Sequence, residues 1–223
     1  MNGPGTPAGV RRRTVCRTLF AALLGGCAGL PRPGPAPRVY RLSPKTTFPA
    51  DLPRVDWSLA VAEPLAERAL DTDRIAVVRG GFEVLYFAGV LWSDRVPAML
   101  QLLMVQSFLA SGALAAVGTD RDIFRPDYLL RPVLHAFQVQ ERPKQGRVVR
   151  ISFSASLLRM PRRRIVLVRR FAEERPVVER SMAAIVRAFD EALGKVLKRL
   201  VIWTIETGQK DRRAHGLPGA GLL

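Results

Sequence analysis

The chain has 223 residues, 48% of them hydrophobic, and a formal net charge of +16 at pH 7. This length limits it to one domain, or at most two small ones, and the apolar content is sufficient to bury a core. It contains 30 Arg and only 5 Lys, a skew that fits a GC-rich genome as well as it fits any ligand.

The first element in chain order is an export signal that ends at a cysteine. Arg11-Arg12-Arg13 and Arg17 precede a short apolar run, residues 19–24, and Leu24-Gly25-Gly26-Cys27 follows. A basic region, an apolar region and small residues at a cut site define a signal peptide. A cysteine after the small residues resembles a bacterial lipobox. We therefore predict a lipoprotein signal peptide over 1–26 and lipidation of Cys27.

Other interpretations of this segment stay open. An ordinary secretory signal could contain the cysteine by chance, and Arg12-Arg13 is also seen in twin-arginine signals. A membrane span is not predicted, because the apolar run is about half of the roughly 20 residues that a spanning helix needs.

Cleavage before Cys27 changes both the charge and the redox chemistry of the mature protein. It would remove four arginines and no acid, so the net charge falls from +16 to +12. Cys16 would leave with the signal, and no intramolecular disulfide is then possible. A basic balance suits nucleic acid, an anionic membrane or an acidic partner. Exported proteins rarely meet nucleic acid, so we expect none here.

Residues 27–37 form a tether rich in proline and glycine. Such a segment extends by roughly 3 Å per residue, about 30 Å in all. A single folded domain is predicted for residues 38–207, followed by a disordered, Gly-rich tail over 208–223.

Alternating hydrophobicity predicts most of the folded domain to be strands. Short strands are expected at 39–42, 57–62, 74–79, 82–88 and 114–117, with a hairpin around Gly80-Gly81. Longer strands at 127–141, 146–160 and 164–171 form an antiparallel meander. Pro132 predicts an edge position or a bulge in the first of these.

Two helices are expected. The first spans 95–111, with Ser93 or Asp94 as the N-cap and Pro97 in the first turn. Its apolar stripe comprises Met99, Leu102, Leu103, Leu109, Ala110 and Ala113, and is extended by Leu100, Met104 and Phe108. Such a helix is a central core helix, or part of its face meets another subunit. The second helix, 179–206, is amphipathic.

The sequence shows no set of residues typical of an active site. His135 is expected to be structural, His215 lies in the predicted tail, and no nucleophile elbow surrounds Ser152, Ser154 and Ser156. We find no phosphate loop, dinucleotide fingerprint or zinc spacing. We therefore predict no enzyme activity, no cofactor and no metal site.

The order of the motifs resembles one family over residues 38–203. The lipobox cysteine is followed by Tyr40-x-Leu42, Leu70-Asp71-x-x-Arg74-Ile75, Val84-x-Tyr86 with Trp92 and Pro97, Asp127-Tyr128-x-Leu130, Phe137, Ser156-Leu157, Arg170-Phe171 and Trp203. This order is similar to that of the ABC-type transport auxiliary lipoproteins, the PqiC-like proteins.

The resemblance implies a fold, partners and a location. The fold is a three-layer α/β sandwich with a mixed, largely antiparallel sheet and two main amphipathic helices, similar to the N-terminal domain of TolB. The partners are an MCE-domain protein and an ABC permease and ATPase that move lipids between the inner and outer membranes. The lipoprotein would form a homo-oligomeric ring at the outer membrane. Ala28, where aspartate would favour retention, agrees with outer-membrane sorting.

Other functions are weighed beside this docking role. A carrier of lipid or lipopolysaccharide would need a pocket of a few hundred Å³ for an alkyl chain. A general envelope-assembly lipoprotein of the TolB-like kind is a further alternative. Tyr86, Trp92 and Trp203 are the candidate core or interface aromatics, because large aromatics dominate both environments.

Overall fold

The computed structural model describes residues 3, 36–123, 125–144 and 146–216. The predicted signal peptide apart from residue 3, Cys27 and the tether as far as residue 35 lie outside this range. The residues from Pro37 onward group into one compact unit. Within the described ranges, none of the helices combines the length and the apolar character that crossing a membrane requires.

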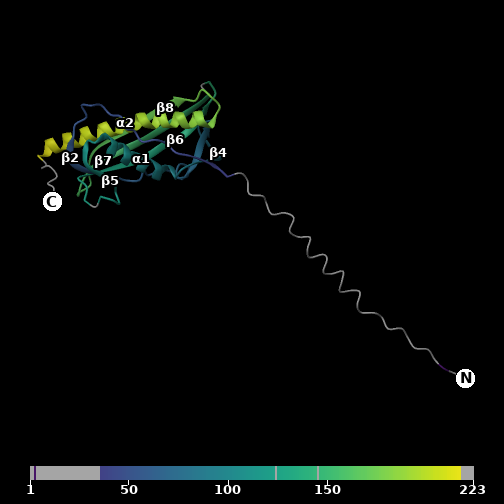
Figure 1. Cartoon of the computed structure of the whole chain (residues 1–223), viewed down its shortest axis with the longest axis horizontal. Coiled ribbons are helices and arrows are strands. Elements are labelled where there is room, and N and C mark those ends of the chain that lie inside the picture. Colours follow the sequence, from purple (N-terminus) through teal and green to yellow (C-terminus); the bar gives the residue numbers. More distant parts are fainter. Residues whose placement is uncertain (1–2, 4–35, 124, 145, 217–223) are drawn as a thin grey trace. The chain divides into compact units, whose positions relative to one another are not determined.

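The described part of the chain forms eight strands and two helices (Figure 1). In chain order they are β1 (Arg38–Tyr40), β2 (Val55–Val61), β3 (Arg74–Arg79), β4 (Glu83–Trp92), α1 (Val96–Ser111), β5 (Leu114–Thr119), β6 (Tyr128–Arg142), β7 (Gly146–Arg159), β8 (Arg164–Pro176) and α2 (Met182–His215). The predicted hairpin β3–β4 and the meander β6–β7–β8 are both confirmed.

Strand β6 organises the sheet. One of its edges pairs along its length with β7, antiparallel. Its other edge is shared: β2 pairs in parallel with its first residues, and β3 pairs in parallel with its last. The short strands β1 and β5 extend the sheet in parallel beyond β4 and β2. The sheet is thus mixed, and its long pairings are antiparallel.

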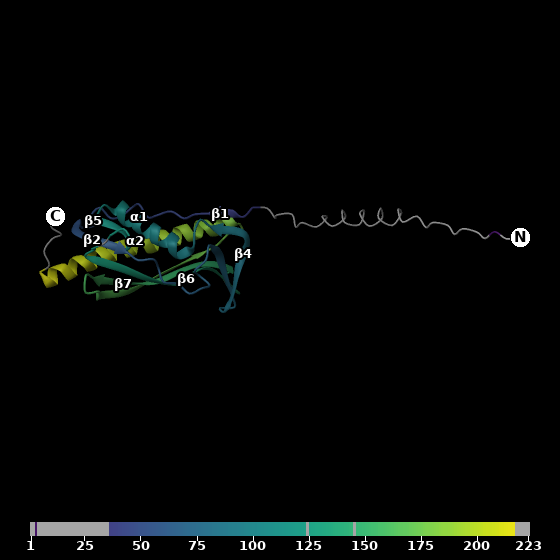
Figure 2. The same ribbon diagram turned by 90° about the horizontal axis from the view of Figure 1, so that it is seen from below.

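The predicted α/β class with a mixed sheet and two main helices is confirmed. Helix α2 packs on β7 and β8, and α1 packs on β5 and contacts α2. Figure 2 shows α2 between α1 and the long strands. The inner face of β7 is fully buried beneath α2, as its alternation predicts, through Val149, Ile151, Phe153, Ala155 and Leu157. This packing fixes α2 along the sheet.

Pro132 does not lie on an edge strand, because β6 is paired on both sides. Its carbonyl accepts from Leu65 N at 3.0 Å, on the edge shared by β2 and β3. The nitrogen and carbonyl of one strand residue point to the same side, so the missing N–H falls in the gap between β2 and β3. The bulge lies further along, between Leu134 and Ala136. Proline is tolerated because no partner strand needs its donor.

Helix α1 begins and faces differently from the prediction. Arg95 is the N-cap and makes no side-chain cap, while Gly112 ends the helix in the left-handed conformation, with φ 60°. The buried face is centred on Leu100, Met104 and Phe108, whereas Leu102 and Leu109 of the predicted stripe are exposed. A helix that is apolar around most of its girth has no unique moment, so sequence periodicity could not orient it.

The predicted boundary at residue 207 is wrong, because α2 continues to His215. Gly208 was interpreted as the helix end. It lies inside the helix, where a Cβ would stand 2.6 Å from a ring carbon of Trp57. The glycine therefore allows α2 to approach β2 closely. Residues 217–223 of the predicted tail lie outside the described range.

Candidate functional site

Strand β8 presents a free edge with apolar side chains. Among the strands that the structure describes, it pairs only with β7. Ile165, Leu167 and Val168 remain 54%, 48% and 53% exposed. An unpaired edge of this kind is a template for another strand, and proteins usually protect it with charge or a covering element. The apolar part of β8 is thus a candidate interaction surface.

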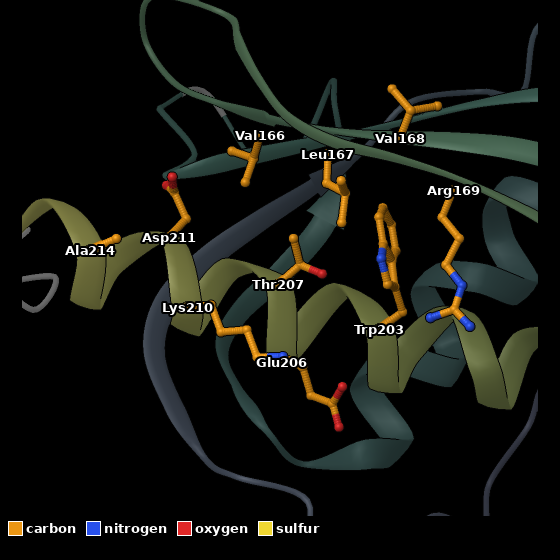
Figure 3. A pocket seen from close by; sticks show the side chains of 10 residues that line it. All are labelled: Val166, Leu167, Val168, Arg169, Trp203, Glu206, Thr207, Lys210, Asp211 and Ala214. Carbon is orange, nitrogen blue, oxygen red and sulfur yellow. The ribbon is translucent and has the colours of Figure 1, made fainter.

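A groove runs between this part of β8 and the second half of α2 (Figure 3). Its volume is about 550 Å³. The lining residues are Val166, Leu167, Val168 and Arg169 from β8, with Trp203, Glu206, Thr207, Lys210, Asp211 and Ala214 from α2. Leu167 and the Trp203 ring reach into the groove from opposite elements, and Glu206 and Lys210 are exposed on α2. The groove is apolar with charges of both signs beside it.

Trp203 links the groove to the core. Its side chain is buried and packs edge-on against Phe171, with ring centroids 5.5 Å apart. Phe171 in turn lies 5.6 Å from Phe153 on β7. The indole Nε1 is buried and has no acceptor among the described residues. The groove wall is thus continuous with the packed interior.

A polar network holds the groove half of α2 against the sheet. The Tyr128 hydroxyl donates to Asp211 at 2.8 Å, and Arg159 lies 3.3 Å from the same carboxylate. Burial raises the pKa of Tyr128, and the hydrogen bond to Asp211 raises it further. Arg212 also contacts Asp127 at 3.4 Å. A helix tied down at several points presents a fixed groove wall, which lowers the ordering cost of binding.

The other two predicted aromatics lie elsewhere. Trp92 is buried at the end of β4 and packs edge-on against Phe189 and Phe137, with centroids 5.1 and 5.7 Å away. Tyr86 is partly buried, and its hydroxyl donates to Ala69 O at 3.0 Å. Of the three predicted aromatics, Trp203 alone lines the groove. Cys27 lies outside the described residues.

The groove holds no set of catalytic residues. In the described ranges no three His, Cys, Asp or Glu side chains gather closely enough to hold a metal ion. His135 lies on β6, where its Nε2 is 2.7 Å from Ser154 Oγ, and no carboxylate orients it. The arrangement is suited to binding an extended or helical segment.

Sequence reasoning did not single out the β8 residues. The signal was present in the run Ile165-Val166-Leu167-Val168, which is apolar at consecutive positions where strict alternation is expected for a strand with one wet face. Such a run indicates a strand that is covered on both faces, and in this structure one face and one edge remain open.

Comparison with known proteins agrees with this geometry. The family model of the ABC-type transport auxiliary lipoprotein component matches residues 40–201. The crystal structure of protein XCC0632 from Xanthomonas campestris is similar, with a TM-score of 0.74 and 33% identity, over 78% of this chain and 98% of that one. A second crystal structure, of an uncharacterized protein, shares the fold at a TM-score of 0.53 and 14% identity, over 80% of this chain and 99% of that one.

A curated relative is longer than the region that matches. Protein bll6063 of Bradyrhizobium diazoefficiens, itself uncharacterized, is 29% identical over 149 residues, which are 66% of this chain and 39% of that protein. The matched region thus spans about two fifths of that relative.

Proposed function

This chain belongs to the family of ABC-type transport auxiliary lipoprotein components, and we propose that it is a non-catalytic docking component of an MCE-type lipid-transport system. In this proposal Cys27 carries the lipid and anchors the domain at the periplasmic face of the outer membrane. The domain then meets an MCE-domain protein and the ABC permease and ATPase.

The observation that carries the docking role is the exposed β8 edge beside the groove. Fully burying an aliphatic side chain contributes about 1.5–3 kcal/mol. Ile165, Leu167 and Val168 are each about half exposed. Covering the remaining surface of all three would therefore contribute about 3 kcal/mol, before the cost of ordering the partner. A segment that pairs with the free edge would add main-chain hydrogen bonds.

Self-association is the second part of the proposal. Leu102 and Leu109 are two helical turns apart on α1 and exposed, and α1 packs on β5, whose outer edge has no described partner strand. We assign this face to contact with another copy in a ring. Light scattering on the purified lipoprotein in detergent should give a multiple of the protomer mass. A monomer at all concentrations would contradict the ring.

The carrier alternative needs an interior cavity. The described pockets are surface grooves, and the largest is about 850 Å³, lined by turn residues at one end of the sheet. The space between the sheet and α2 is filled by buried side chains such as Phe137, Phe153 and Phe189. Lipid that co-purifies in stoichiometric amount would favour the carrier over the docking role.

Co-purification from detergent-solubilised membranes tests the docking role. The wild-type protein should recover the MCE-domain and permease subunits, identified by mass spectrometry. Leu167→Glu places a charge in the groove and should abolish recovery. Leu65→Glu is the matched control, because Leu65 is exposed on a different surface and this change should leave recovery intact. Equal recovery with both variants would contradict the assignment of the groove.

A further inference from the structure

One end of the sheet combines exposed apolar side chains on two neighbouring loops. Phe82 in the β3–β4 turn is 88% exposed, and Val178 between β8 and α2 is 94% exposed. The loops are adjacent, because Gly80, Val177 and Val178 line one surface groove. The Phe82 ring lies over Gly80. A phenylalanine at the tip of a turn contributes nothing to the core, so its exposure needs another explanation.

Basic side chains surround these two residues. Arg79 and Arg180 line the same groove. Glu141 is held between Arg79 at 2.9 Å and Arg147 at 3.2 Å. Arg180 has no acidic partner within 4 Å among the described residues, and the same holds for Lys144 in the β6–β7 turn. Phe82, Val178, Lys144 and Arg180 are called the tip surface below.

The chain that leads to Cys27 leaves the domain toward this end. Strand β1 runs parallel to β4, with Arg38 opposite Val90. The residues before Arg38 therefore continue toward the start of β4, where Glu83 borders the turn that carries Phe82. Figure 2 shows β1 and β4 together at one end and the last turns of α2 at the other.

The lengths agree with a membrane at this end. Val90 and Glu83 are seven strand residues apart, about 23 Å at roughly 3.3 Å per residue. The ten residues 28–37 span at most about 35 Å when fully extended. The tether is thus long enough for the tip surface to reach the membrane that holds a lipidated Cys27.

We propose that the tip surface rests on the anionic phospholipid headgroups of the membrane that anchors the protein. Phe82 and Val178 enter the interfacial layer, and Arg180 and Lys144 contact lipid phosphates. This inference rests on the proposed lipidation of Cys27. Strand β8 runs from Arg164 at the far end to Pro176, which pairs with Val148 near the tip surface. The membrane contact would therefore point the groove at Leu167 away from the bilayer, toward a periplasmic partner.

Fluorescence quenching by brominated lipids tests the contact. The lipidated full-length protein is reconstituted into vesicles of phosphatidylcholine and phosphatidylglycerol, with ordinary or brominated acyl chains. Phe82→Trp is the probe, and Ile165→Trp is the matched control at the opposite end of β8. The native Trp57, Trp92 and Trp203 are buried and give a constant background. Flotation of the vesicles measures anchoring separately.

The expected result is a blue-shifted emission for Phe82→Trp and loss of the added fluorescence in brominated vesicles, with no loss for Ile165→Trp. The loss should be smaller when phosphatidylglycerol is omitted. Protein that floats with the vesicles but shows no quenching at position 82 overturns the membrane contact and leaves the lipid anchor intact. Protein that does not float overturns both. Equal quenching at positions 82 and 165 also overturns the contact.

Discussion

Gly208→Ala probes the close packing of α2 against β2. The added Cβ would stand 2.6 and 2.9 Å from two ring carbons of Trp57, which is itself fully buried. Overpacking a core of this kind costs about 1–3 kcal/mol. Alanine is better than glycine inside a helix by about 1 kcal/mol, which offsets part of that cost. We expect a net loss of about 1–2 kcal/mol in the free energy of unfolding.

Gly194→Ala is the matched control in the same helix. A Cβ at Gly194 meets only the Lys45 side chain at 4.0 Å, which is ordinary contact. This variant should be more stable than wild type by up to about 1 kcal/mol. The difference between the two variants in urea unfolding isolates the packing cost, because the gain in helix propensity is common to both. Equal stability of the two variants would refute the close approach of α2 to Trp57.

Three further predictions concern the buried network, the acidic limb and the anchor. Tyr128→Phe removes the hydrogen bond to the Asp211 carboxylate and should cost about 1–3 kcal/mol in urea unfolding; no loss would contradict the network. The Arg79 guanidinium holds the pKa of Glu141 below its usual 4.5. Its contribution to stability is therefore present above about pH 4.5 and lost as pH falls through the lowered native pKa. Glu141→Gln should flatten this acid dependence, and an unchanged slope would count against the ion pair. Cys27→Ser should move the protein from the membrane fraction to the soluble fraction with unchanged circular dichroism; a variant that stays membrane-bound would disprove lipid anchoring at this cysteine.

The strands were largely predictable because their signal is local. Alternation located β6, β7 and β8, and Gly80-Gly81 located the turn of the hairpin β3–β4. The parallel pairing of β2 and β3 with opposite halves of β6 was not predictable, since nothing within either segment specifies a partner far away in the chain. Pro132 was misassigned to an edge for the same reason. Its compatibility with a central strand depends on where two other strands end.

The helices show the limit of local rules. Gly208 reads as a stop signal in isolation, and only the position of Trp57 on another element explains why a glycine is needed within the helix. The candidate groove was missed because two elements build it, and neither shows a cleft by itself. Trp203 was selected as an aromatic of interest. Its place between core and groove depends on the packing of α2 on β8.

A photo-crosslinking residue at position 167, in cells that express the transport system, tests the docking account most directly. The account predicts a covalent adduct with an MCE-domain or permease subunit, identified by mass spectrometry. The same crosslinker at position 65 should give none, because Leu65 lies exposed on a different surface. Absence of an adduct at 167, or the same adduct from both positions, would contradict a docking role for the groove between β8 and α2.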